Sequence, residues 1–253
     1  MNRGRLYIDI ETLPPLAWSD DQVDAYVRER VPGTYKKPES IAQWCDENRQ
    51  EVFGRAALDW RVSRVACIGL AYETPGSLQT AVLDGGTNDE AERRMLDSLE
   101  LMLSTWRAYD AVVIGHNVLG FDLPRLHLLA ARVRHRSTAW FRELNGNPRA
   151  RVIDTQALAF STRERVSLSD LAASCGVGEK SGHGSEVLDM WLNGQHVELR
   201  AYCLQDVLLT RAVHRALVGD YAEEAHEAIE RRGMNMDQAQ VASLIGDAMK
   251  GER

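Results

Sequence analysis

The order in which strand-like and helix-like segments follow one another restricts the fold of this chain more than any other feature. Runs with the composition of β-strands cover residues 5–10, 64–72, 78–83, 110–115 and 151–153. A turn that contains Pro75-Gly76 joins the second run to the third and predicts a hairpin, whereas helical segments separate the later runs. Strands joined through helices can pair in parallel, so the order predicts an α/β fold with a central mixed sheet flanked by helices.

Proline and asparagine residues indicate where several of the predicted strands and helices begin or end. The first strand should stop just past Glu11, because Pro14-Pro15 lacks the backbone donors of a central strand. Residues 16–60 show helix-like patches and no β alternation, so we expect a helical insertion there. Asn88 can cap a helix over 89–108, and residues 145–149 are typical of a loop rich in glycine, asparagine and proline. We expect one domain over residues 1–218 and a C-terminal helical appendage over 219–253.

Composition limits the class of protein. The chain has 253 residues, of which 44% are hydrophobic and 26% charged, so it can bury a sizeable core. It has no membrane-length apolar run, and its start turns acidic where a secretory signal would be apolar, so we expect a cytoplasmic protein. The four cysteines form no CxxC pair, which argues against a zinc knuckle and a disulfide framework.

Charge argues against a protein that holds nucleic acid by bulk electrostatics, because the formal net charge is -7. The negative net charge does not exclude an enzyme. The segment 125–151 is nonetheless locally basic, with seven arginines against the single acid Glu143. It is either a solvated helix face with a loop or a contact for a phosphate backbone.

Acidic residues stand at three separate places in the predicted fold. Asp9 and Glu11 lie two apart on the first strand and therefore share one face, either as a solvated pair at the strand end or as part of a site. Asp122 falls in the first turn of a helix, where an acid can also simply complement the helix dipole. Tyr202 and Asp206 have the i, i+4 spacing that places a phenol and a carboxylate on one helical face, although a capping or salt-bridged Asp206 is the simpler explanation of that carboxylate taken alone.

If these four carboxylates meet, they form an oxygen-rich environment suited to Mg²⁺ or Mn²⁺ and poorly suited to zinc. Two such ions about 3.5–4 Å apart can activate a water and stabilise the leaving 3′-oxygen of a phosphodiester. This chemistry needs several acids and no protein nucleophile.

The three motifs together resemble those of the DEDD (DnaQ-like) 3′-5′ exonuclease superfamily. YIDIET at 7–12 is similar to its first motif, GHNVLGFDLP at 115–124 to its second and YCLQD at 202–206 to its third. The strongest similarity is to the proofreading exonuclease domain of family B DNA polymerases and its free-standing relatives, over roughly residues 4–218. Tyr202 and Asp206 match the tyrosine (DEDDy) form, whereas the histidine form would have histidine where Ala201 stands.

The resemblance implies a ribonuclease H-like fold and a role for each motif residue. Asp9 would bridge two divalent cations, Glu11 and Asp206 would complete the tighter site, Asp122 would serve the second, and Tyr202 would position the attacking water. The residues expected to line the bound nucleotide are Ile10, Thr12, Leu13, His116, Asn117 and Phe121. Leu13 fits equally well as a wedge against the terminal base and as a plain core leucine.

The sequence thus favours a 3′-5′ exonuclease that acts on nucleic acid with a free 3′ end, releases nucleoside 5′-monophosphates and favours DNA, single-stranded above all, over RNA. Replication or repair proteins are candidate partners, and a membrane is not. The alternatives are a catalytically silent nucleic-acid-binding or replication accessory module on the same fold, and an exoribonuclease. No GxGxxG, GxxxxGK[ST] or GxSxG motif occurs, which argues against Rossmann, P-loop and serine-hydrolase chemistry. The insertion, the loop at 178–185 and the tail leave substrate preference open. We expect His183 to be a loop residue and Asp170 to serve a helix start. Asp154 is either a helix cap or an acid that supports the residues of the site.

Overall fold

A five-stranded mixed sheet forms the centre of the molecule. The computed structural model describes residues 3–160, 164–180 and 184–220. The strands lie in the order β3 (Ser77–Asp84), β2 (Arg64–Thr74), β1 (Arg5–Leu13), β4 (Val112–Gly115) and β5 (Val152–Asp154). β1, β2 and β3 pair antiparallel, whereas β4 and β5 join parallel to β1 and to each other. The predicted hairpin and the predicted parallel extension are both confirmed.

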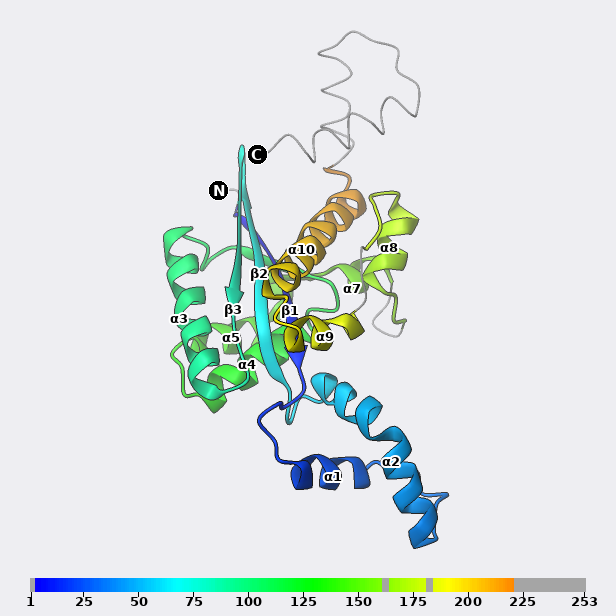
Figure 1. The fold of residues 1–253 in the computed structure, drawn as a ribbon. Helices are drawn as coiled ribbons and strands as arrows, with labels where there is room; N and C mark the ends of the chain where they lie inside the picture. The colour runs from blue at the N-terminus through cyan, green and yellow to red at the C-terminus, as the bar shows by residue number, and fades with distance from the viewer. Residues whose placement is uncertain (1–2, 161–163, 181–183, 221–253) are drawn as a thin grey trace.

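Helices cover both faces of this sheet (Figure 1). One face packs against α3 (Asp89–Thr105), α4 (Asp122–Arg132) and α5 (Thr138–Gly146). The long helix α10 (His196–Val218) crosses the other face and contacts α7 (Thr155–Ala159), α8 (Leu168–Cys175) and α9 (Val187–Leu192). The Asn88 side chain accepts a hydrogen bond from Ala91 N, as expected of an N-cap of α3.

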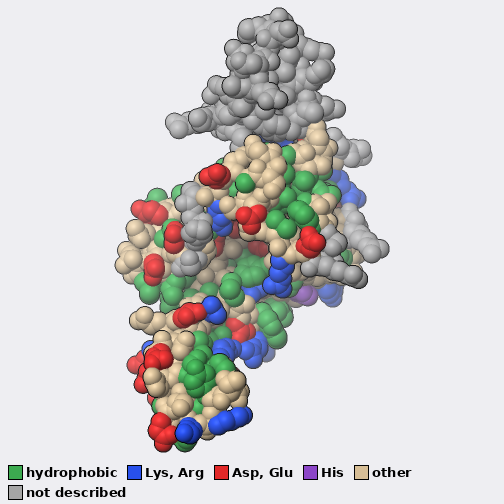
Figure 2. Space-filling model, turned by 90° about the vertical axis from the view of Figure 1, so that its right-hand side faces the viewer, with side chains coloured by type: hydrophobic (Ala, Val, Ile, Leu, Met, Phe, Trp, Pro, Cys, Tyr) green, Lys and Arg blue, Asp and Glu red, His purple; other side chains and the backbone are tan. Residues whose placement is uncertain are grey.

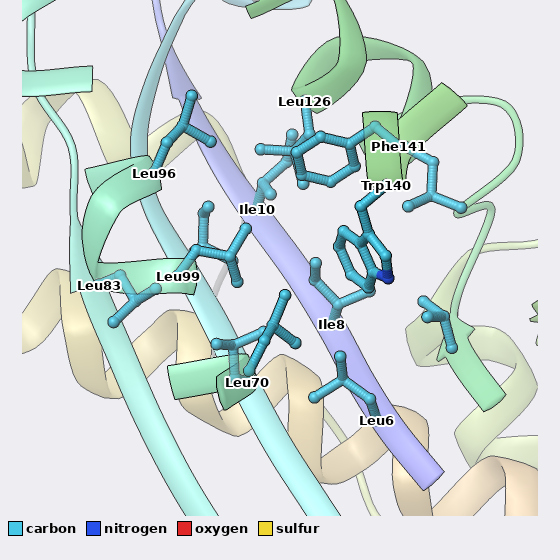
Figure 3. Packing of buried hydrophobic residues seen from close by; sticks show 14 of the residues in the cluster. Leu6, Ile8, Ile10, Leu70, Leu83, Leu96, Leu99, Leu126, Trp140 and Phe141 are labelled. Atoms are coloured by element: carbon cyan, nitrogen blue, oxygen red, sulfur yellow. The ribbon is translucent and has the colours of Figure 1, made fainter. Parts of the chain in front are cut away.

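Alternation along β1 decides which residues meet which helices. Leu6, Ile8 and Ile10 point into the main core with α3, α4 and α5 (Figure 3). Tyr7 points the other way and packs with Val207 of α10. Each buried aliphatic side chain contributes about 1.5–3 kcal/mol, so a one-residue slip in register would be strongly unfavourable. The odd-numbered residues of β1 are therefore fixed on the face that α10 covers.

Gly69 allows α10 to approach the sheet closely. It lies opposite Asp9 in the β1–β2 register. A Cβ atom at this position would stand 2.8 Å from Val207 Cγ2, 2.9 Å from Cys203 Sγ and 3.1 Å from the Cys203 carbonyl oxygen. The missing side chain therefore sets the distance between β2 and the turn of α10 that carries Cys203.

The predicted helical insertion is present as a hairpin of α1 (Asp20–Arg28) and α2 (Pro38–Arg55), followed by the short 3₁₀ turn η1 (Ala56–Leu58). Ser19 and Gln22 form a capping box at the start of α1. Arg49 of α2 forms ion pairs with Asp20 and Asp24 of α1. The hairpin projects away from the sheet, and only its base reaches the rest of the molecule (Figure 1).

Some expected boundaries were wrong. β1 continues to Leu13 and α3 ends at Thr105. The expected loop at 145–149 is largely helical, because α5 runs to Gly146 and Pro148 occupies the first position of α6 (Pro148–Arg151). Proline at a helix start lacks only a donor that would be unpaired anyway. Residues 221–253, where we expected an appendage, lie outside the described residues. Within the described part of the chain, no helix has the length and apolarity needed to cross a membrane.

Candidate metal-dependent site

β1 carries the first two acids toward α10. Asp9 is partly buried and Glu11 is 8% exposed, and the ladder with β2 is irregular directly after Glu11. Removal of water by the surrounding protein and the charge of the nearby Asp206 together raise the pKa of Asp9 to about 8. The pKa of Glu11 is raised to about 10 by burial and by Asp9. The two carboxylates are thus held close together in a site where the charged form of either is energetically unfavourable unless a cation is bound.

Asp122 lies near Asp9 but belongs to α4, which packs on the face of the sheet opposite α10. It is the first residue of α4 and is 3% exposed, and its Oδ1 accepts a hydrogen bond from Ile10 N at 3.0 Å. Burial and the charge of Asp9 raise the pKa of Asp122 well above its ordinary value. Asp122 is therefore more than a surface acid that complements the dipole of α4, because it is tied to β1.

Asp154 fixes the backbone that leads to Asp122. Its carboxylate accepts hydrogen bonds from Asn117 N (2.9 Å), Leu119 N (3.1 Å) and Gln156 N (3.0 Å). It caps α7, as expected, and also holds the turn after β4, where Asn117 has a positive φ of 54°. His116 Nε2 donates to the Val166 carbonyl at 2.8 Å, and burial lowers the His116 pKa.

The third motif approaches from α10. Tyr202 and Asp206 are 5% and 3% exposed and lie on one face of the helix, as their spacing predicts. Burial raises the pKa of Tyr202, the nearby Lys180 lowers it, and the charges of Asp206 and Glu11 raise it further. The Tyr202 hydroxyl and Asp206 Oδ1 are buried and have no hydrogen-bond partner among the described residues. Such groups are costly unless a ligand satisfies them.

Lys180 also belongs to this site, and sequence reasoning missed it. Its Nζ lies 2.5 Å from Asp206 Oδ2 and 4.7 Å from the centroid of the Tyr202 ring. Burial alone would lower the pKa of Lys180, but the hydrogen bond to Asp206 raises it above its ordinary value. The only signal in the sequence was a lysine in the glycine-containing segment at 178–185, which is too weak to place it. His183 of that segment lies outside the described residues.

The carboxylates of the site fit hard divalent cations, whereas the neighbouring Cys203 thiol is a soft donor. Ligand atoms of Asp9, Glu11 and Cys203 lie within 4.8 Å of one another. Asp206 and Asp122 stand outside this tightest group but interact electrostatically with Asp9. Four carboxylates with raised pKa values face one lysine, so a bound Mg²⁺ or Mn²⁺ would relieve their mutual repulsion. The unpartnered Asp206 Oδ1 is a free ligand atom for such an ion.

The residues expected to line a nucleotide fall into two groups. Ile10 and Leu13 are 4% and 0% exposed and pack in the core, so their contact with a nucleotide stays a prediction. Thr12 is 9% exposed. His116, Asn117 and Phe121 are partly exposed, and the Arg125 guanidinium lies 3.5 Å above the Phe121 ring.

Fold and site together define an α/β protein of the ribonuclease H-like class with an acidic centre at the end of its first strand. A family model described as "Predicted 3'-5' exonuclease related to the exonuclease domain of PolB" matches residues 57–245. The chain belongs to this family. The matched part contains Asp122, Lys180, Tyr202 and Asp206, whereas Asp9 and Glu11 precede it.

Comparison of structures supports the fold. The family B DNA polymerase from the hyperthermophilic archaeon Pyrobaculum calidifontis matches with a TM-score of 0.53 and 17% identity. The match covers 86% of this chain and 25% of the polymerase, so the chain corresponds to about a quarter of that protein's length. No curated protein matches significantly in sequence.

Proposed function

We propose that the chain is a metal-dependent 3′-5′ exonuclease that hydrolyses the terminal phosphodiester of nucleic acid, single-stranded DNA above all. The observation that carries the proposal is the convergence of Asp9, Glu11, Asp122 and Asp206 beside the unpartnered Tyr202 hydroxyl. Burying so many acids together is unfavourable unless cations are bound. A family related to a polymerase exonuclease domain supports the same reaction class.

Each side chain has a role that its position supports. Asp9 interacts electrostatically with each of the other three acids and would be shared by both cations. Glu11 and Asp206 would complete one site, and Asp122 would complete the second. When bound, the two cations would supply an activated water and stabilise charge on the leaving 3′-oxygen. Tyr202 would hold the attacking water through its hydroxyl, which has no competing partner among the described residues. Lys180 would lie close to the scissile phosphate, since its ammonium group already stands between Asp206 and Tyr202.

The proposed products are nucleoside 5′-monophosphates, released one at a time. The residue proposed to orient the attacking water is Tyr202 rather than a histidine, which is consistent with the tyrosine form of the superfamily. His116 is not a candidate base, because both of its ring nitrogens contact Thr155 and Val166.

A digestion experiment tests the proposal. The protein is incubated with 5′-labelled single-stranded DNA and RNA of matched sequence, with Mg²⁺ or Mn²⁺ and with EDTA. We expect a ladder of shortened DNA strands with either metal and none with EDTA. Strands that bind but stay full-length under both metals would instead identify a silent binding module, and faster shortening of RNA would identify an exoribonuclease.

A further inference from the structure

An exposed tryptophan lies at the base of the α1–α2 hairpin, just after η1. Trp60 is 60% exposed and Leu58 is 62% exposed. Large apolar side chains so open to water are costly and often mark a binding surface when they are contiguous. Acidic and basic side chains gather where the hairpin lobe joins the body of the molecule (Figure 2).

Contacts connect this segment to the acid centre. Arg125 Nη2 donates a hydrogen bond to the Leu58 carbonyl. The same guanidinium stacks 3.5 Å above the ring of Phe121, the residue directly before Asp122. These contacts link Phe121, Arg125 and Leu58 outward from Asp122, and Trp60 follows Leu58 two residues later in the chain. We call these four residues the outer strip.

The segment that carries Trp60 is held rigidly. Asp59 accepts hydrogen bonds from the side chains of Arg61, Tyr26 and Arg30, and its carbonyl accepts from Val62 N and Ser63 N. Hydrogen bonds from Arg61 hold the pKa of Asp59 below its ordinary value, so its charge is balanced locally. Because the backbone around Trp60 is already ordered, a ligand that stacks on the ring would lose little affinity to ordering it.

Arg125 gives the strip a cationic group at its centre. Its guanidinium stacks on the Phe121 ring and donates to the Leu58 carbonyl. A planar cation between two apolar groups fits a chain that presents flat bases and phosphates alternately. The proposed exonuclease function places a nucleic-acid strand beside Asp122, so single-stranded nucleic acid rather than a protein is the occupant that we assign to the strip.

We propose that the outer strip is the path along which the single strand enters the site, with Trp60 as a stacking platform for a base upstream of the terminal nucleotide. This proposal rests on the proposed exonuclease function and assigns a substrate contact to the hairpin base. Stacking of a base on an aromatic side chain contributes roughly 1–3 kcal/mol, so removing the ring should weaken strand binding by about tenfold. Only substrates long enough to reach Trp60 should show the loss in full.

The experiment compares Trp60→Ala, Trp60→Phe and the wild type on a thymidine dinucleotide and a 15-nucleotide oligothymidylate. We expect Trp60→Ala to raise the KM for the long strand about tenfold relative to the KM for the dinucleotide, with little change in kcat, and Trp60→Phe to restore most of the loss. Tyr35→Ala is the matched control, because Tyr35 is an exposed aromatic residue (40%) of the same insertion, just before the start of α2 and away from the hairpin base. It should not change the ratio of the two KM values.

Binding without cleavage separates the two proposals. Affinity for the labelled long strand is measured in EDTA by fluorescence anisotropy. An equal affinity of Trp60→Ala and wild type, together with an unchanged KM ratio, would overturn the platform and leave the exonuclease proposal intact. A wild-type protein that cleaves neither substrate would contradict the exonuclease proposal, and the EDTA measurement would still decide whether Trp60 binds the strand.

Discussion

The two oxygens of Asp206 have different surroundings. Oδ2 contacts the Lys180 ammonium, whereas Oδ1 is buried and has no partner among the described residues. Such an arrangement is expected of a carboxylate that shares a cation site with a lysine. The free oxygen is the simplest place to test whether the centre binds metal.

Asp206→Asn should reduce cleavage by about 10³-fold, which corresponds to about 4 kcal/mol of lost transition-state stabilisation. The amide keeps the size of the side chain but removes the charge that binds a cation. Steady-state rates with Mn²⁺ check the prediction, with Asp46→Asn on the exposed face of α2 as the matched control. Equal rates for Asp206→Asn and wild type would contradict the ligand assignment.

Tyr202→Phe should lower kcat by about 10²-fold, in the range of a group that orients a proton transfer. The ring stays buried against its apolar neighbours, so the increase in Tm produced by Mn²⁺ should remain as in the wild type. If kcat is unchanged, the Tyr202 hydroxyl does not contact the attacking water.

Lys180→Ala should lower the Mn²⁺ concentration required for half-maximal activity, because the ammonium group competes with a metal ion for Asp206. The maximal rate should fall at the same time, because a cation near the phosphate is lost. Metal-activation curves measure both quantities, and Lys37→Ala on the exposed hairpin serves as the control. A curve shifted to higher metal concentration would show that Lys180 supports rather than competes with metal binding.

At the scale of elements, local signals predicted most of what was found. Strand composition, the Asn88 cap and the proline pair defined β1, β2, β3 and α3 to within a few residues, because each signal acts on the backbone beside it. The prediction of a loop around Pro148 was wrong, because proline can either break a helix or start one. Lys180 could not be predicted, since its contact with Asp206 joins residues far apart in the chain and has no local signature.

The packing of α10 on β2 gives a test at this scale. Gly69→Ala would place a methyl group 2.8 Å from Val207 Cγ2 and 2.9 Å from Cys203 Sγ. We expect a loss of about 1–3 kcal/mol in the free energy of unfolding, as for other overpacked cores, and reduced activity because α10 carries Tyr202 and Asp206.

The matched control is Gly54→Ala in α2, where a Cβ atom would meet nothing within 4 Å. Alanine favours a helix over glycine by about 1 kcal/mol, so this variant should be slightly more stable and equally active. Denaturant unfolding measures both changes. Full stability and activity in Gly69→Ala would show that the α10–β2 distance is not critical.

At the scale of the whole molecule, the acid centre should make stability depend on pH. The folded protein holds protons on Asp9 up to a pKa of about 8 and on Glu11 up to about 10, above the ordinary values of 3.8 and 4.5. Without metal, the unfolded chain binds fewer protons on these two groups between these limits, so their contribution to stability is fully present below the ordinary values and is lost as the pH rises through 8 and beyond.

Thermal unfolding in EDTA should therefore give a Tm that falls between pH 5 and pH 9, and Mg²⁺ should reduce the fall because it stabilises the deprotonated carboxylates. Asp206→Asn should show a shallower fall in EDTA. A Tm in EDTA that does not change over this pH range would contradict the raised pKa values.

Direct measurement of Mn²⁺ binding by electron paramagnetic resonance, compared with cleavage in the same samples, tests most directly whether the four acids form one centre. The account predicts that the wild type binds Mn²⁺ and cleaves, and that each of Asp9→Asn, Glu11→Gln, Asp122→Asn and Asp206→Asn loses both affinity and activity. Undiminished Mn²⁺ binding with full cleavage in any one of these variants would contradict it.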